Sequence, residues 1–145
     1  MRRKKEAVLC FDWSDRNAPK IVVEAHAKYK RISDLLDANP RVADLVHRDV
    51  KTLSSENRGG RRGEYTSESI LRALIVKTLE GDSFRDVVVR IADNGFLCDF
   101  VRLGNEPVMD FTFLNKCFKA IQPQTWRRIN EVLGQQAEAE GRLDP

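Results

Sequence analysis

The sequence is poor in the residues that build disulfide frameworks and metal centres. It has three cysteines and two histidines in 145 residues. The cysteines, Cys10, Cys98 and Cys117, are odd in number and form no Cys-x-x-Cys pair. The histidines, His26 and His47, complete no zinc-ligand spacing. We therefore expect free thiols in a reducing cytoplasm, no disulfide, and no metal or other cofactor held by this chain.

Long apolar runs and catalytic motifs are also missing. No hydrophobic stretch of the length of a signal peptide or a membrane span follows the basic start, MRRKK. The segment HRDVK at 47–51 is similar to a kinase catalytic loop, but Ser54 stands where that loop needs Asn for a magnesium ion. No Gly-rich phosphate loop and no nucleophile with an evident base partner is present. We expect no membrane contact, no small-molecule substrate and no chemistry within these residues.

Charge is distributed unevenly along the chain. The net charge is +3, but residues 1–62 carry 15 Lys and Arg against 9 Asp and Glu, a net of +6. Residues 63–145 carry 10 against 13, a net of −3. The excess lies in MRRKK and in RGGRR at 58–62. A basic arm and a basic linker suit a polyanionic partner, and they equally suit plain solubility.

Apolar residues recur at helical spacing from Ile21 onward, and no segment alternates as a strand does. The first helix presents one apolar seam, formed by Val22, Ala25, Tyr29, Ile32 and Leu36. Asn39-Pro40 ends this helix and begins another that continues to Leu53. The pattern predicts an antiparallel helical hairpin over 21–53 after an irregular basic arm at 1–20.

The Gly- and Arg-rich segment at 54–65 predicts a linker to a second helical unit over 66–140. We expect a helix capped by Thr66 or Ser67 and stopped by Gly81, and a helix begun by Ser83 and ended by Asn94-Gly95. A short segment from Phe96, a helix capped by Thr112 and a last helix from Gln122-Pro123 follow. The predicted fold is all-α, an N-terminal hairpin plus a helix-turn-helix-like bundle.

The helix predicted over 112–121 has two sharply different faces. One face is apolar and consists of Phe113, Leu114, Cys117, Phe118 and Ile121; the other is polar and consists of Asn115, Lys116, Lys119 and Gln122. Asn can contact adenine, Lys can reach guanine or phosphate, and a helix fits the major groove. Any surface helix carries such residues outside, so the pattern leaves a recognition helix and an ordinary core helix open.

The chain resembles the N-terminal domain of bacterial DDE insertion-sequence transposases of the ISNCY type. The ordered segments that carry the resemblance are LEG at 79–81, SFR at 83–85, RIAD at 90–93, FVRLG at 100–104 and DFTFL at 110–114. The upstream stretch AHAKYKRISDLLDANPRVADLVHRDV, at 25–50, is similar to the same group. The set is fairly specific because of its order, whereas any one piece is weak.

The resemblance implies a helical region that helps to bind the element's terminal inverted repeats. In such transposases a following RNase H-like domain cuts and joins DNA, using three carboxylates and two divalent metal ions. The sequence ends at Pro145, about where that domain would begin. We therefore expect the divalent metal only in that domain, and no strand-transfer activity from this chain, whether it is a truncated product, a partial sequence or a cloned domain.

Double-stranded DNA in the bacterial nucleoid is the partner that this hypothesis predicts. The candidate base contacts are Asn115, Lys116 and Lys119, and Arg61 and Arg62 are expected at the backbone or in the minor groove. The candidate phosphate contacts are Arg85, Arg90, Arg127 and Arg128, although the last two lie near Glu131 and could form helical ion pairs instead.

A competing hypothesis is a protein-interaction domain that dimerises the transposase through the 21–53 hairpin without reading DNA. The net −3 of residues 63–145 favours it, because a DNA-reading body is usually more basic.

Overall fold

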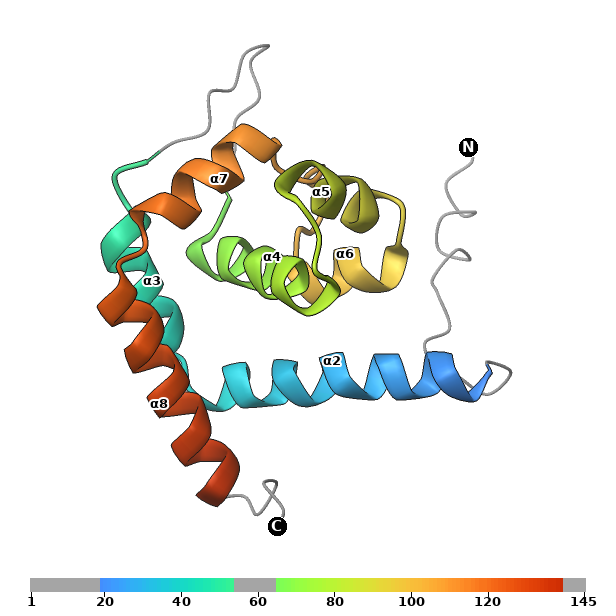
Figure 1. Cartoon of the computed structure of the whole chain (residues 1–145), viewed down its shortest axis with the longest axis horizontal. Coiled ribbons are helices and arrows are strands. Elements are labelled where there is room, and N and C mark those ends of the chain that lie inside the picture. The colour runs from blue at the N-terminus through green and yellow to red at the C-terminus, as the bar shows by residue number, and fades with distance from the viewer. Residues whose placement is uncertain (1–18, 54–64, 140–145) are drawn as a thin grey trace.

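The computed structural model describes residues 19–53 and 65–139, and within these ranges the chain forms helices and no strand (Figure 1). The all-α prediction is therefore confirmed. The helices are α2 (Lys20–Ala38), α3 (Arg41–Val50), α4 (Ser67–Glu80), α5 (Phe84–Ala92), α6 (Gly95–Val101), α7 (Phe111–Ala120) and α8 (Pro123–Ala139). In the described ranges no helix is long and apolar enough to cross a bilayer.

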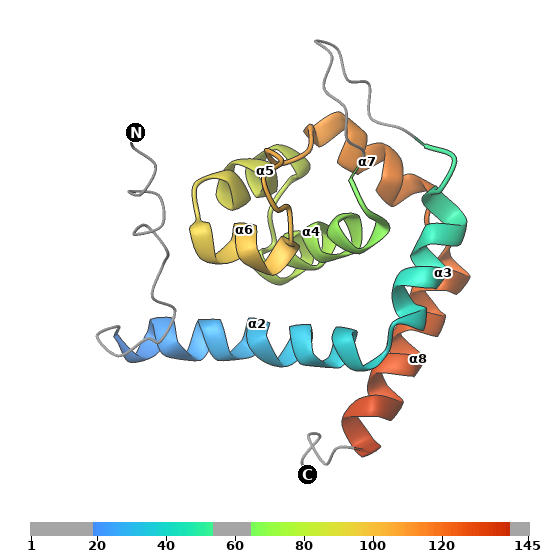
Figure 2. The same ribbon diagram turned by 180° about the vertical axis from the view of Figure 1, so that it is seen from behind.

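The helices are arranged around α4. It packs against α3, α5, α6 and α7, while α2 runs along one side of the body and contacts α6 and α8. Two helices far apart in the sequence, α3 and α8, lie side by side at one end (Figures 1 and 2). On the side away from α2, α7 closes the body and leads directly into α8.

One hydrophobic core joins residues from all seven helices. Its centre is α4, whose Leu71, Leu74 and Val76 are almost fully buried. Both α2 and α3, which precede residues 54–64, contribute to it, for example through Tyr29 and Val46. Helices of this length are marginal in isolation, so burial against their neighbours supplies most of their stability.

The two N-terminal helices do not form the predicted antiparallel hairpin. The turn at Asn39-Pro40 separates them as expected, but α3 turns away from α2 (Figures 1 and 2). The seam of α2 packs on other helices instead: the ring of Tyr29 meets Phe100 edge-on, with centroids 5.0 Å apart. Because α3 buries its apolar residues against α4, α7 and α8, the seam of α2 packs on α6 and α8 instead.

Helix ends follow local signals at three of the predicted positions. The Thr66 hydroxyl accepts a hydrogen bond from the Ser69 N–H at 3.0 Å and caps α4. Gly81 ends α4 with a left-handed φ of 69°, a conformation that costs glycine little. Ser83 caps α5 by accepting from the Asp86 N–H at 3.0 Å. These predictions are confirmed.

Two other helix ends differ from the prediction. Asn94 begins α6 rather than ending α5, because its side chain accepts from the Leu97 N–H at 3.1 Å. Asp110, not Thr112, caps α7, and its carboxylate accepts from the Thr112 N–H at 3.1 Å. A carboxylate at this position is also stabilised by the positive end of the helix dipole.

Candidate nucleic-acid interface

The helix α7 lies on the outside of the body and is held from within. Its buried residues, Phe113, Leu114 and Cys117, face the core, and α3, α4 and α5 pack against it. Of the two helices that precede it, α5 packs against α7, whereas α6 packs on α2, α4 and α5. Burial raises the pKa of the Cys117 thiol to about 11, as expected for a cysteine that acts as a small core side chain.

The opposite side of α7 carries the three predicted base contacts. Lys116 and Lys119 are exposed, and Asn115 is half-buried. Within residues 19–53 and 65–139 none of the three has a hydrogen-bond or ion-pair partner. The structure therefore brings these residues together on one accessible face, with their polar groups uncommitted to other described side chains.

Although Phe118 belongs to the predicted apolar face of α7, it is not buried in the core. Its side chain is 42% exposed, and its ring contacts the rings of Phe84 and Trp126, at centroid distances of 5.7 and 6.2 Å. Phe118 lies at the border of the apolar face of α7, where no neighbouring helix covers it fully. Helical periodicity gives the direction of a side chain but not the extent of the surface that packs over it.

Two of the four predicted phosphate contacts have no ion-pair partner among the described residues. The guanidinium of Arg85 lies over the ring of Phe111, 4.3 Å from its centroid, and so holds its charge next to the N-terminus of α7. Arg127 is exposed on the first turns of α8 and has no ion-pair partner among the described residues. Its neighbour Trp126 contacts Phe118 of α7.

The other two arginines are engaged within the chain. Arg90 donates to Asp82 at 2.6 Å and lies 3.6 Å from Glu80. The hydrogen bond from Arg90 lowers the pKa of Asp82 from its usual range. Arg128 pairs with Glu131 at 3.2 Å, the helical pair that the spacing allowed. Arg61 and Arg62 lie outside the described residues.

Asp49, a residue that no sequence motif singles out, fixes the start of α8. Asp49, on α3, accepts from the Gln122 N–H at 3.0 Å and from the Thr125 hydroxyl at 2.6 Å. Burial alone would raise the pKa of Asp49, but these hydrogen bonds and the nearby Arg48 hold it below its usual range. The carboxylate thus caps α8 from a different helix and sets the position of the turn that carries Arg127.

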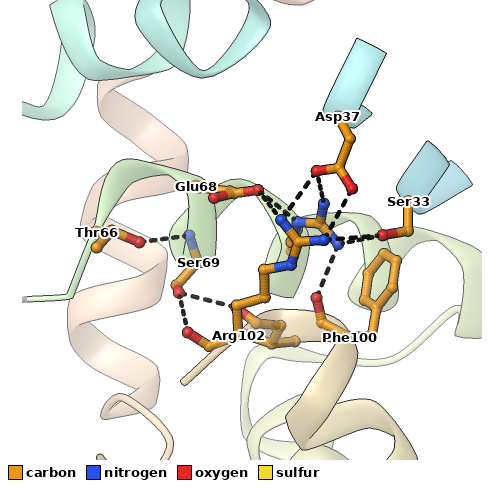
Figure 3. A network of polar contacts seen from close by, with 9 residues as sticks. Ser33, Asp37, Thr66, Glu68, Ser69, Phe100 and Arg102 are labelled. Atoms are coloured by element: carbon orange, nitrogen blue, oxygen red, sulfur yellow. Dashed lines mark hydrogen bonds and ion pairs between the residues drawn. The ribbon is translucent and has the colours of Figure 1, made fainter. Parts of the chain in front are cut away.

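A second polar cluster joins Ser33, Asp37, Glu68 and Arg102 (Figure 3). It is built around Arg72, whose side chain is fully buried. Its guanidinium donates to Glu68 at 3.1 Å, to Ser33 at 3.0 Å and to the Phe100 carbonyl at 3.0 Å, and it pairs with Asp37 at 3.3 Å. These partners lie on α2, α4 and α6. The planar donor fork of arginine is suited to such a site, where each N–H finds a separate acceptor.

Arg102 completes this cluster from the end of α6. It binds Asp37 at 2.9 Å and Glu68 at 3.0 Å, and the hydrogen bond from Arg102 lowers the pKa of Asp37. Arg102 has a left-handed backbone with φ of 63°, and its side chain reaches Asp37 on α2. The cluster joins α2, α4 and α6, whereas the helices that pack against α7 are α3, α4 and α5.

Carboxylates, thiols and imidazoles do not gather elsewhere in the described ranges. No three such groups between residues 19 and 53 or 65 and 139 come close enough to hold a metal ion.

No protein-family model matches this chain, and neither a curated protein nor a solved structure matches it.

Proposed function

We propose that this chain is the DNA-binding domain of a transposase and recognises the terminal inverted repeats during transposition. The observation that carries the proposal is the outer face of α7, where Asn115, Lys116 and Lys119 are accessible and have no hydrogen-bond or ion-pair partner among the described residues. A polar helix face with uncommitted cations and an amide is suited to the major groove of duplex DNA.

Each group on this face has a role that its chemistry supports. The amide of Asn115 can bond an adenine edge through two hydrogen bonds, and the Lys119 ammonium can reach guanine or phosphate. Arg85, next to the N-terminus of α7, and Arg127, on the first turns of α8, would bind the sugar-phosphate backbone. Arg90 and Arg128 are assigned to intramolecular ion pairs and not to DNA contact.

The transposase part of the proposal rests on the ordered segments between residues 79 and 114 that resemble the insertion-sequence transposases. It assigns repeat binding to this chain, and the metal-dependent cutting and joining steps to an RNase H-like domain. The proposed place of action is the bacterial nucleoid, where the duplex target lies.

Dimerisation through α2 is less well supported as the main function. Tyr29 and Leu36, the middle and last residues of the predicted interface seam, are buried in the core of the same chain. The apolar surface that α2 still exposes is concentrated in its first turn, where Ile21 is 74% exposed. A single turn offers far less area than a stable protein interface buries.

The proposal is tested by fluorescence anisotropy of the purified chain on labelled duplexes across a salt series. One duplex carries the terminal inverted repeat of the element that encodes the chain, and the other is a scrambled duplex of equal length and composition. We expect tighter binding to the repeat, with an affinity that falls steeply with salt as released counterions require. Equal and weak binding to both duplexes would contradict recognition by α7.

A further inference from the structure

Phe118 is an exposed aromatic residue with a fixed position. Its ring is 42% exposed, yet it is braced by Phe84 on α5 and by Trp126 on α8. Phe84 is itself covered by the ammonium of Lys77, 4.5 Å from the ring centroid. A side chain held in this way loses little conformational freedom when a partner contacts its open edge.

This ring lies beside the proposed base-reading groups. At 100° per residue, Phe118 is about 60° around α7 from Asn115 and about 100° from Lys119, so the three share one side of the helix. A duplex that places a base edge against Asn115 therefore meets the exposed edge of Phe118 within the next base pair or two. The aromatic edge and the amide would read neighbouring positions in the same groove.

The charge around Phe118 determines which partner fits. Lys116 and Lys119 are exposed on the same helix without ion-pair partners among the described residues, and Arg127 follows on α8. A second copy of this face would bring like charges together, which disfavours a symmetric protein contact. A polyanion that also offers a small apolar group fits, and in the major groove that group is the C5 methyl of thymine.

We infer that Phe118 is a specificity-determining residue that contacts a thymine methyl in the major groove, next to the base read by Asn115. This inference rests on the proposed function and adds to it the class of sequence that α7 prefers, an A·T-containing step. Phe84 and Trp126 are positioning residues, because they hold the ring at the groove-facing edge and do not themselves reach the base.

The test removes the methyl group from the DNA rather than the ring from the protein. A preferred duplex is first selected with the full chain from a randomised pool, and each thymine is then replaced singly by deoxyuridine, which pairs identically but lacks the methyl. We expect wild-type binding to weaken about threefold to fivefold at one or two thymines. Phe118→Ala should bind the thymine duplex about threefold to fivefold more weakly than wild type. Replacing the sensitive thymine by deoxyuridine should not weaken binding of Phe118→Ala any further.

A control variant and a second measurement separate this contact from general effects. Val89→Ala removes another exposed apolar side chain, 57% exposed on α5, and should keep the full response to deoxyuridine. If Phe118→Ala does not fold, 5-iododeoxyuridine at the sensitive thymine places a photoreactive iodine where the methyl lies. Irradiation should then cross-link wild-type protein at Phe118, as identified by mass spectrometry of the peptide.

Each result has a definite meaning. A preferred duplex with no methyl-sensitive thymine, a sensitivity unchanged in Phe118→Ala, or a cross-link elsewhere overturns the inference and leaves the proposed function standing. If selection yields no preferred duplex at all, the proposed function fails and the inference fails with it.

Discussion

The carboxylate of Asp49 caps a helix to which it does not belong, by accepting the backbone N–H of Gln122 at 3.0 Å. An unsatisfied N–H at the start of α8 would otherwise need water or a local cap, and Pro123 follows at once. Because α7 ends just before this turn, the contact fixes how α8 leaves α7. The Asp49–Gln122 contact therefore links α3 to the geometry of the proposed interface.

Asp49→Ala should lower the free energy of unfolding by about 1–2 kcal/mol, the usual cost of losing a capping carboxylate. The measurement is urea unfolding followed by circular dichroism. The matched control is Asp34→Ala, on the exposed side of α2 and without an ion pair among the described residues, which should change stability by less than about 0.5 kcal/mol. Equal effects of the two substitutions would show that Asp49 is not a cap.

The stabilisation by Asp49 should depend on pH. Its pKa is lower in the folded chain than in the unfolded one, so the contribution is fully present above the unfolded pKa of about 3.9 and is lost as the pH falls through the folded pKa. The difference in stability between wild type and Asp49→Ala should therefore be constant from about pH 5 to 7 and shrink in more acidic buffer. A difference that grows on acidification would contradict the assigned sign.

Local sequence signals predicted the helices well because each depends on residues within one or two turns. The caps of Thr66 and Ser83 and the stop at Gly81 are examples, and the helical spacing of apolar and polar residues located α7. The role of Asp49 could not be predicted, since its partners are more than 70 residues away in the sequence.

The candidate interface was predictable only in part for the same reason. The outer position of Lys116 and Lys119 follows from the periodicity of α7 alone. The ion pair between Arg90 and Asp82, and the partial exposure of Phe118, depend on how helices meet. The angle between α2 and α3 likewise depends on their packing, since α2 contacts α6 and α8 and α3 contacts α8. The apolar pattern of α2 or of α3 alone does not indicate these partners.

Arg72→Met should be among the most destabilising single substitutions in the fold. It keeps much of the side-chain volume but leaves the Ser33 hydroxyl and the Phe100 carbonyl without their buried donor. We expect a loss of about 2–4 kcal/mol, because breaking one side of a buried polar cluster leaves its partners desolvated. Arg31→Met, at an exposed position on α2, is the control and should change stability by less than about 0.5 kcal/mol in the same urea titration.

Two glycines should respond to alanine with opposite signs. Gly81 has φ of 69°, and no atom lies within 4 Å of an added Cβ, so Gly81→Ala meets backbone strain alone and should cost about 1 kcal/mol. Gly134 lies within α8 with the same open space, so Gly134→Ala should stabilise the chain by about 0.5–1 kcal/mol through helix propensity. Thermal melts of both variants test this prediction. If the melting temperature shifted in the same direction in both, the left-handed assignment of Gly81 or the helical assignment of Gly134 would be wrong.

Substitutions on the outer face of α7 should separate phosphate contact from base reading. Lys119→Ala should weaken all duplexes alike and reduce the slope of log affinity against log salt by about 1 if the ammonium meets phosphate. Asn115→Ala should instead flatten the preference for the cognate duplex by about 1–3 kcal/mol while leaving the salt slope unchanged. Both effects are read from the same anisotropy titrations on the repeat and the scrambled duplex.

The control for these variants is Arg90→Ala, which removes an equal charge that is already paired with Asp82 and Glu80. It should leave the salt slope and the sequence preference near wild type, although it loses a partly exposed ion pair and so some stability. If Arg90→Ala reduced DNA affinity as much as Lys119→Ala did, binding would reflect net charge rather than a defined face of α7. If neither Lys119→Ala nor Asn115→Ala altered binding, α7 would be a core helix with an ordinary solvated side.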